Sequence, residues 1–358
     1  MFEDDLDLYP LCDNKNSSYI NFKRWLNLWL DDLVVQKVSN KTIKSYQEAI
    51  GNFLKFVRYN KIDMDKISAR YINRYLLNYQ IELARIKKSK YLNQLLSEQK
   101  LHKIGKNDAN FTILKEFENS LSHRLTILKM FLKYITQNNA ELHDYTMLFN
   151  KLVKIKISEK MTQYLLPEEI NKIINFMNNW DEQYKRYFSK SSKRDAIRNA
   201  FLLTLYAVTG ARGDEVVHIK LNDIENFSKD KKRYYIVNIE EGKGGKKRRV
   251  LIDAKYIDKY IEYYKKAFND KNYYISSTWR RGNYTNKPMH INTLRNFSNT
   301  ILKILGINKS GLHIYRRGYA TKRIGIDKVD ISIVAKELGN TSAILEKYYL
   351  KYTPELNL

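Results

Sequence analysis

Residues 209–215 read Thr-Gly-Ala-Arg-Gly-Asp-Glu, and three later fragments supply the other polar groups that would surround a phosphate. Residues 241–248 read Glu-Gly-Lys-Gly-Gly-Lys-Lys-Arg, residues 312–316 read Leu-His-Ile-Tyr-Arg, and residues 338–340 read Leu-Gly-Asn, with a tyrosine, Tyr349, nine positions after the asparagine. Cations neutralise the non-bridging oxygens of a phosphodiester, an acid protonates the leaving oxygen, and a phenol can attack phosphorus. The four fragments together predict phosphoryl transfer that needs no metal ion.

The order and spacing of these fragments resemble the tyrosine recombinase (phage integrase, Xer-like) family. The resemblance implies a mainly α protein with a small antiparallel β-sheet, in which a helical core-binding domain precedes a catalytic domain of the DNA breaking-rejoining fold. It implies a site-specific DNA recombinase that cleaves and rejoins DNA through a 3′-phosphotyrosyl intermediate. Such an enzyme needs no metal, ATP or other cofactor, and it resolves dimers or integrates and excises a mobile element.

The resemblance also implies a role for each site residue. The catalytic set would be Arg212, Lys243, His313, Arg316, Asn340 and Tyr349. The two arginines would bind the scissile phosphate, because a guanidinium is permanently charged and donates to two oxygens at once, and Glu215 would hold Arg212 in place. Lys243 would protonate the leaving 5′ oxygen, although the lysines beside it leave open which one acts. His313 would bind the phosphate or accept the proton of the nucleophile.

The chain departs from the family pattern at two positions. Asn340 stands where the family has His or Trp, and an amide donates a hydrogen bond but supplies neither charge nor a proton. Arg317 stands where a histidine is more usual. The nucleophile has an alternative in Tyr348, but the nine-residue interval and the tail 353–355 (Thr-Pro-Glu) favour Tyr349. Adjacent helical residues point about 100° apart, so one of the two tyrosines faces the phosphate.

Composition narrows the class of protein. The formal net charge of +25 over 358 residues favours a polyanionic partner; an AT-rich genome would also add lysine, but would not deplete Asp and Glu this far. The lone Cys12 fits a reducing compartment. The acidic N-terminus does not fit a signal peptide, and no apolar run approaches the roughly 20 residues of a membrane span. We expect a cytoplasmic, nucleoid-associated protein without a metal or a membrane partner.

The chain divides into four expected parts. Residues 1–16 are acidic and predict a flexible arm. Residues 17–157 predict a helical core-binding (SAM-like) DNA-clamp domain, residues 158–165 a linker, and residues 166–358 the catalytic tyrosine recombinase domain. Residues 80–118 are longer than the usual connection in such a domain, and they predict an additional helical insertion.

Local patterns place the expected elements. Ser39 can cap a helix whose apolar stripe contains Ile43, Tyr46, Ile50, Phe53 and Val57. A second stripe contains Leu125, Leu128, Phe131 or Leu132, and Ile135. Pro167 suits the first turn of a further helix. Two β-branched and aromatic runs, 234–239 and 249–252, flank a glycine-rich turn and predict a β-hairpin.

Basic side chains on these elements are the expected DNA contacts. By resemblance the contacts are one threonine, Thr42, and the basic residues Lys41, Lys44, Arg124, Lys129, Lys246 and Arg248. The partner would be double-stranded DNA with paired half-sites, bound by a homotetramer, with a second recombinase or a regulatory protein as a further partner. Nine residues follow Tyr349, fewer than the about 12–15 that an isolated helix needs. We therefore expect a protein that is monomeric or weakly associated when free of DNA and that assembles only on DNA.

Three other functions remain open at this level. A DNA-binding architectural protein of the same fold could have lost catalysis, and Asn340 is the feature that allows it. A type IB topoisomerase shares the constellation but religates the same strand. A helical RNA-binding protein would leave the ordered Arg, Lys, His-x-x-Arg and Tyr unexplained.

Overall fold

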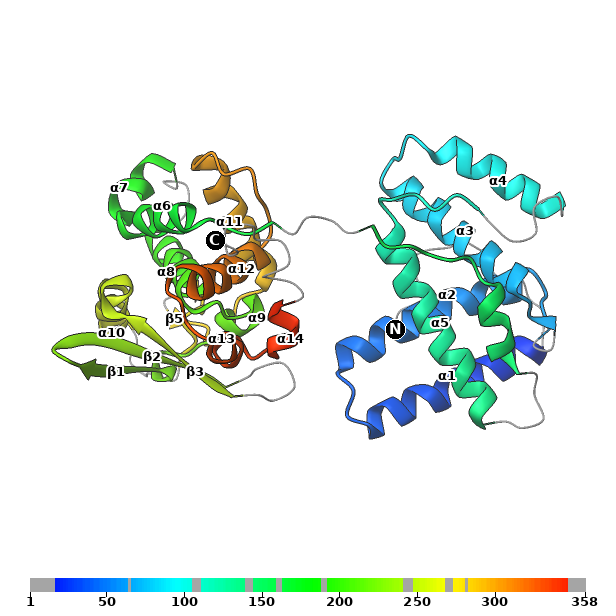
Figure 1. Cartoon of the computed structure of the whole chain (residues 1–358), viewed down its shortest axis with the longest axis horizontal. Helices are drawn as coiled ribbons and strands as arrows, with labels where there is room; N and C mark the ends of the chain where they lie inside the picture. Colours follow the sequence, from blue (N-terminus) through cyan, green and yellow to red (C-terminus); the bar gives the residue numbers. More distant parts are fainter. Residues whose placement is uncertain are drawn as a thin grey trace. The chain divides into compact units, whose positions relative to one another are not determined.

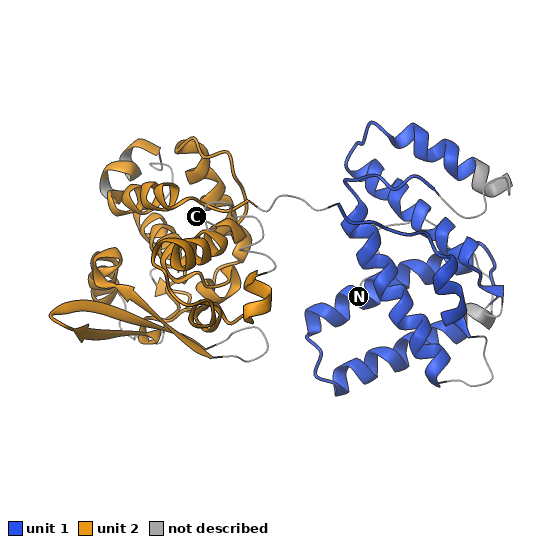
Figure 2. Ribbon diagram, in the orientation of Figure 1, with its two compact units in different colours: residues 1–159 blue, residues 160–358 orange. Residues whose placement is uncertain are grey.

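The computed structural model describes residues 17–63, 66–104, 111–138, 144–158, 163–187, 192–240, 247–267, 273–280 and 283–346. The chain divides into two compact units, residues 1–159 and residues 160–358 (Figures 1 and 2). The described elements are mostly helices with a small antiparallel sheet, as the sequence predicted, and a second, two-stranded sheet that it did not predict. None of the described helices is long and apolar enough to cross a membrane.

Unit 1 is helical throughout its described residues. Its elements are α1 (Ser17–Val35), α2 (Asn40–Tyr59), α3 (Ala69–Ile86), α4 (Leu92–Ile104), α5 (Glu118–Asn138) and the 3₁₀ helix η2 (Tyr145–Lys151). The predicted cap of α2 is confirmed, because the Ser39 hydroxyl accepts a hydrogen bond from the Thr42 N–H at 3.2 Å. The predicted stripe of α2 faces the core, where Phe53 packs edge-on against Tyr75 and Phe22.

The expected insertion contains a helix that is fastened to its neighbours. Helix α4 lies beside α3 (Figure 1), where the Gln99 amide donates to Asn78 Oδ1 at 2.7 Å. The chain returns along α3, because the buried Gln80 amide donates to the Thr112 carbonyl and accepts from the Leu114 N–H. These hydrogen bonds make α4 part of unit 1 and not a loose appendage.

Unit 2 surrounds the long helix α8 with shorter helices. The helices are α6 (Pro167–Asn178), α7 (Trp180–Tyr187), α8 (Lys193–Thr209), α9 (Gly213–Val217), η3 (Leu221–Asp223), η4 (Ala254–Tyr256), α10 (Asp258–Ala267), α11 (Ile291–Ile304), α12 (His313–Thr321), the π-helical turn η5 (Lys322–Ile326), α13 (Ile331–Leu338) and α14 (Ser342–Leu345). Apolar residues on every side of α8 are buried, as the core position of this helix requires.

The larger sheet lies along one edge of unit 2, below α8 and α12 in Figure 1. Its strands β1 (Ile224–Lys229), β2 (Lys232–Ile239) and β3 (Arg248–Asp253) are antiparallel in the order β1-β2-β3. The two predicted strands are confirmed, and the register pairs Ile239 with Arg248. Strand β1 was not predicted. The short strands β4 (Trp279–Arg280) and β5 (Asn283–Tyr284) form a second hairpin.

The chain is anchored to α12 where it enters unit 2. Leu165 is fully buried, and its N–H donates to the Ile314 carbonyl at 3.2 Å. Arg317 Nη1 donates to the Gln163 carbonyl at 3.0 Å. A Cβ on Gly318 would lie 2.6 Å from the Leu165 carbonyl oxygen, so only glycine permits this approach. The sequence placed Leu165 in the linker; it belongs to the core of unit 2 because its apolar side chain is buried there.

Candidate functional site

The corner between α8 and α9 presents Arg212. Helix α8 ends at Thr209 and is capped by Gly210, whose φ of 60° is left-handed. A Cβ at this glycine would lie 2.6 Å from Tyr319 Cδ1 and 2.8 Å from Leu338 Cδ2, so a larger residue cannot take its place without a shift. Arg212 then stands at the N-cap of α9 with its side chain 24% exposed. The guanidinium is held by the protein and still reaches the surface.

Glu215 is shared by two arginines. Its Oε1 accepts from Arg212 Nη1 at 2.9 Å and from Arg248 Nη1 at 3.1 Å. Its Oε2 accepts from the Arg212 N–H at 2.7 Å and forms a short contact with Arg248 Nη2. Burial alone would raise the pKa of Glu215, but hydrogen bonds and charge from the two arginines outweigh burial and lower the pKa to about 2. The carboxylate is therefore ionised at any working pH.

Arg316 lies between the ends of two helices. It is 2% exposed, and its Nη1 donates to the Gly210 carbonyl at 2.8 Å while its Nη2 donates to the Leu338 carbonyl at 2.6 Å. These carbonyls terminate α8 and α13, where the helix dipole is negative and stabilises a cation. Both of these acceptors are neutral, whereas Arg212 faces a carboxylate.

Asn340 follows α13 and contacts Arg212. Gly339 ends the helix with a φ of 62°. Arg212 Nη2 then donates to Asn340 Oδ1 at 3.0 Å and to the Gly339 carbonyl at 3.3 Å. Because a guanidinium only donates, the amide oxygen must face it. The NH₂ group of Asn340 is thereby turned away from Arg212 and can donate to another acceptor.

His313 begins α12 with an exposed imidazole. Partial desolvation and the positive charges of Arg317, Arg316 and Arg212 lower the pKa of His313 below its usual value. The imidazole is consequently neutral near pH 7 and can accept a proton. The arginines that act on it include both predicted phosphate ligands.

The pKa of His313 gives a first testable prediction. Arg317→Gln removes the neighbouring cation with the largest effect on that pKa, so the pKa of His313 should rise. The imidazole would then become protonated at a higher pH as the solution is acidified. We expect the imidazole C–H NMR signals of His313 to titrate at higher pH in the variant. The acid limb of the pH profile of the cleavage rate should also shift to higher pH. If His313 titrates at the same pH in the variant and in the wild type, the charge of Arg317 does not act on the imidazole as the structure indicates.

Four of the predicted site residues lie outside the described residues: Lys243, Lys246, Tyr348 and Tyr349. The strands that flank the first two are described, since Ile239 of β2 pairs with Arg248 of β3. The described residues that gather at one place are Arg212, Glu215, His313, Arg316 and Asn340. They come from the start of α9, the start of α12 and the corner after α13.

Arg248 was expected to contact DNA, and its placement corrects that expectation. Its side chain is 6% exposed and bonded to Glu215, because Arg248 lies on the same face of β3 as the buried Val250 and Ile252. The alternation of a strand was the signal in the sequence that could have shown this. The next residue, Arg249, points outward with 62% of its side chain exposed.

Arg124 also departs from the expected exposed face. It is 7% exposed, its guanidinium lies 4.2 Å from the centre of the Tyr79 ring, and its Nη1 donates to the Glu48 carbonyl at 3.4 Å. Arg124 is three residues after Leu121 and four before Leu128, so it falls on the buried stripe of α5. The Arg124 side chain therefore supports packing between α3, α2 and α5.

The other predicted contacts of unit 1 lie nearer the surface. Lys41 and Lys44 are exposed on the first turns of α2. The Thr42 hydroxyl lies 2.8 Å from the Ser39 hydroxyl and so takes part in the helix cap. Lys129 is partly buried, with its ammonium 5.5 Å from the centre of the Phe149 ring.

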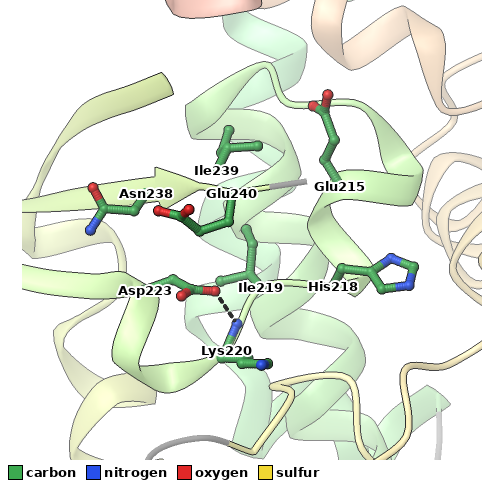
Figure 3. A pocket seen from close by; sticks show the side chains of 8 residues that line it. All are labelled: Glu215, His218, Ile219, Lys220, Asp223, Asn238, Ile239 and Glu240. Carbon is green, nitrogen blue, oxygen red and sulfur yellow. Dashed lines mark hydrogen bonds between the residues drawn. The ribbon is translucent and has the colours of Figure 1, made fainter. Parts of the chain in front are cut away.

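A small cavity of about 70 Å³ lies between α9 and the end of β2 (Figure 3). Its lining residues are Glu215, His218, Ile219, Lys220, Asp223, Asn238, Ile239 and Glu240. Figure 3 shows that the carboxylates of Glu215, Asp223 and Glu240 point in different directions, and Asp223 accepts from the Lys220 N–H at 2.8 Å. In the part of the chain that the structure describes, no group of three or more His, Cys, Asp or Glu could hold a metal ion.

Comparisons with known proteins relate both units of the chain to one family. The chain matches the phage integrase family over residues 163–354 and the N-terminal SAM-like domain of phage integrases over residues 26–100. It is 24% identical over 337 residues to a tyrosine recombinase of Agathobacter rectalis, covering 92% of each chain. It is 24% identical over 365 residues to the tyrosine recombinase XerH of Campylobacter jejuni, covering 96% of this chain and 94% of that one. A crystal structure of XerH bound to difH substrate in a pre-cleavage complex matches with a TM-score of 0.55, 18% identity and 97% coverage of both chains.

Proposed function

Because this chain belongs to the phage integrase family of tyrosine recombinases, we propose that it cuts and rejoins specific DNA sites through a 3′-phosphotyrosyl intermediate. The observation that carries the proposal is the meeting of Arg212, Arg316, His313 and Asn340 from three separate segments. Cations and polar donors gathered at one partly exposed point suit the charge that develops on a phosphoryl group. The accompanying Glu215 fixes Arg212 without cancelling the excess of positive charge.

The proposed cleavage step uses these residues together with Tyr349 and Lys243, which lie outside the described residues. The Tyr349 oxygen attacks phosphorus and loses its proton to His313, while the bond from phosphorus to the 5′ oxygen breaks. That oxygen takes its proton from Lys243. A 5′-hydroxyl of a second strand reverses the step and releases the tyrosine. One phosphodiester is exchanged for another through a phosphotyrosine, so no external energy source is required.

The proposed substrate is double-stranded DNA with two half-sites, on which four copies of the chain assemble. The formal net charge of +25 supports strong and salt-dependent attraction to DNA. Helix α11 adds an outward face made largely of amides and hydroxyls, which are groups that read base edges in the major groove. The exposed residues of that face are Asn292, Thr293, Arg295, Asn296, Asn299 and Thr300.

Covalent capture tests the proposal and identifies the DNA site in the same experiment. The purified protein is incubated with sheared DNA of its own genome that carries nicks, so that cleavage releases a short oligonucleotide and cannot be reversed. We expect an SDS-resistant adduct, and sequencing of the attached DNA should recover inverted half-sites. A duplex built from that sequence should then undergo strand exchange. Adducts without strand exchange would indicate a topoisomerase-like nicking-closing enzyme, and specific binding without adducts would indicate an architectural protein.

Asn340 gives a prediction that separates its donor role from a packing role. Asn340→Asp keeps the shape of the side chain but replaces the outward NH₂ group with a carboxylate oxygen that repels phosphate. We expect cleavage by this variant to fall on the order of 10²–10³-fold, as when a donor to an oxyanion is removed. Asn340→Ala, which adds no negative charge, should lose less. Equal activity of the two variants in the covalent-capture assay would show that the amide does not face the phosphate.

A further inference from the structure

We propose that Arg248 is a positioning residue of the recombination site, which holds Arg212 and the Asn340 corner against the hairpin strand. The inference rests on the proposed function, since it assigns a role within the same site. Arg248 is the first residue of β3 and follows the segment 241–246 that contains Lys243. Its side chain joins three segments that are far apart in sequence.

The first contact reaches Arg212 through a carboxylate. Arg248 donates to both oxygens of Glu215, and the same two oxygens accept from the side chain and the backbone of Arg212. The Glu215 side chain is 4% exposed, so water cannot replace a lost partner. Without Arg248, one arginine alone would have to neutralise a buried carboxylate.

The second contact reaches the corner that carries Asn340. Arg248 Nε donates to the Glu337 carbonyl at 2.8 Å, in the last turn of α13. The side chain then passes over Gly339, where a Cβ would lie 3.4 Å from Arg248 Cδ. Arg248 therefore contacts the last turn of α13 and packs against Gly339, the left-handed residue that directs the Asn340 amide towards Arg212.

Electrostatics explains why an arginine is required at this position. Burial favours the neutral form of Glu215, and the two guanidinium groups together reverse that preference. With Arg248 present, Glu215 stays ionised and keeps its hydrogen bonds to Arg212 over the whole working range of pH. With Arg248 removed, the pKa of Glu215 should rise, and acid would release Arg212 from its partner.

Arg248→Gln tests the inference, with Arg249→Gln as its matched control. Arg249 is the next residue on the same strand, but its side chain is exposed and pairs with Glu225. In the covalent-capture assay we expect Arg248→Gln to cleave about 10²-fold more slowly, the loss that follows a displacement of roughly 1 Å in a catalytic group. DNA affinity should change by less than about 3-fold, because many basic residues share the binding. The control should stay within about 3-fold for both quantities.

The pH profile distinguishes positioning from a general loss of structure. Arg248→Gln should show an additional fall in cleavage rate towards acid pH, as Glu215 becomes protonated and releases Arg212. In the double variant Arg248→Gln/Glu215→Gln the side chain at position 215 is neutral at every pH, so this variant should lack the fall and should cleave at neutral pH about as slowly as Arg248→Gln does in acid. If Arg248→Gln does not fold, Arg248→Lys keeps the charge without the planar fork and should be slower than the wild type without the extra acid limb.

Several outcomes would overturn this inference about Arg248 and leave the proposed function standing. Wild-type cleavage by Arg248→Gln or Arg248→Lys would show that Arg212 needs no such support. Equal losses of affinity and rate would make Arg248 a DNA contact. Absence of adducts with the wild-type protein is a different result, which contradicts the proposed function itself.

Discussion

Tyr349→Phe should abolish the covalent adduct while leaving DNA binding intact. The substitution removes one hydroxyl and keeps the ring, so the change is confined to the group that would attack phosphorus. Loss of a nucleophile in a hydrolase costs on the order of 10⁶-fold in rate, and we expect cleavage to fall below detection. The measurement is SDS-resistant adduct on nicked DNA, with affinity followed separately by gel shift.

Tyr348→Phe is the matched control, because it removes the same atom one position earlier. It should form the adduct at nearly the wild-type rate. A reversed result, with Tyr348→Phe inactive and Tyr349→Phe active, would mean that the nine-residue interval from Asn340 does not select the nucleophile. If both single variants still form the adduct, the nucleophile must be a residue other than these two tyrosines.

Arg212→Ala should reduce cleavage by about 10³–10⁵-fold, the range over which an arginine stabilises phosphoryl transfer. Arg316 requires a gentler change, because it is buried and donates to two carbonyls that alanine would leave without this partner. Arg316→Lys keeps the charge but not the fork, and we expect a loss of about 10²-fold. Both rates are measured under single-turnover conditions on the captured site.

DNA affinity separates catalysis from binding for these arginines. It should fall much less than the cleavage rate, since each arginine is one cation among many. Arg233→Ala is the control, because Arg233 lies on β2 with 64% of its side chain exposed and pairs with Asp258. Parallel losses of affinity and cleavage for Arg212→Ala would assign that residue to DNA binding and not to the transition state.

Regular patterns made much of the fold predictable. The cap at Ser39 and the strands on either side of the glycine-rich turn were predicted because they follow local rules of periodicity and turn chemistry. Strand β1 was missed because nearly all of its side chains are exposed. Burial does not alternate along Ile224–Lys229 as it does along β2 and β3. Its turn uses Asp230 and Lys231 with positive φ angles, in a hairpin without glycine.

The sequence proposed the members of a site but could not show the contacts between them. Sequence order pointed to Arg212, His313, Arg316 and Asn340, but it could not show which arginines share a carboxylate. Arg124 and Arg248 were both misplaced for one reason: charge alone was taken as a sign of exposure. An arginine on a buried face is stabilised by partners distant in sequence, here Tyr79 for one and Glu215 for the other. Those partners follow from the tertiary fold alone.

The anchoring of the chain at α12 has a mechanical consequence. One face of this helix carries His313 and Arg316, while its other contacts fasten the entering chain through Ile314, Arg317 and Gly318. Tension on the chain at Gln163 would therefore act directly on the helix that carries His313 and Arg316, the two residues proposed to bind the phosphate. A pull strong enough to break the hydrogen bonds of Leu165 and Gln163 would remove two of the contacts that hold α12 in place.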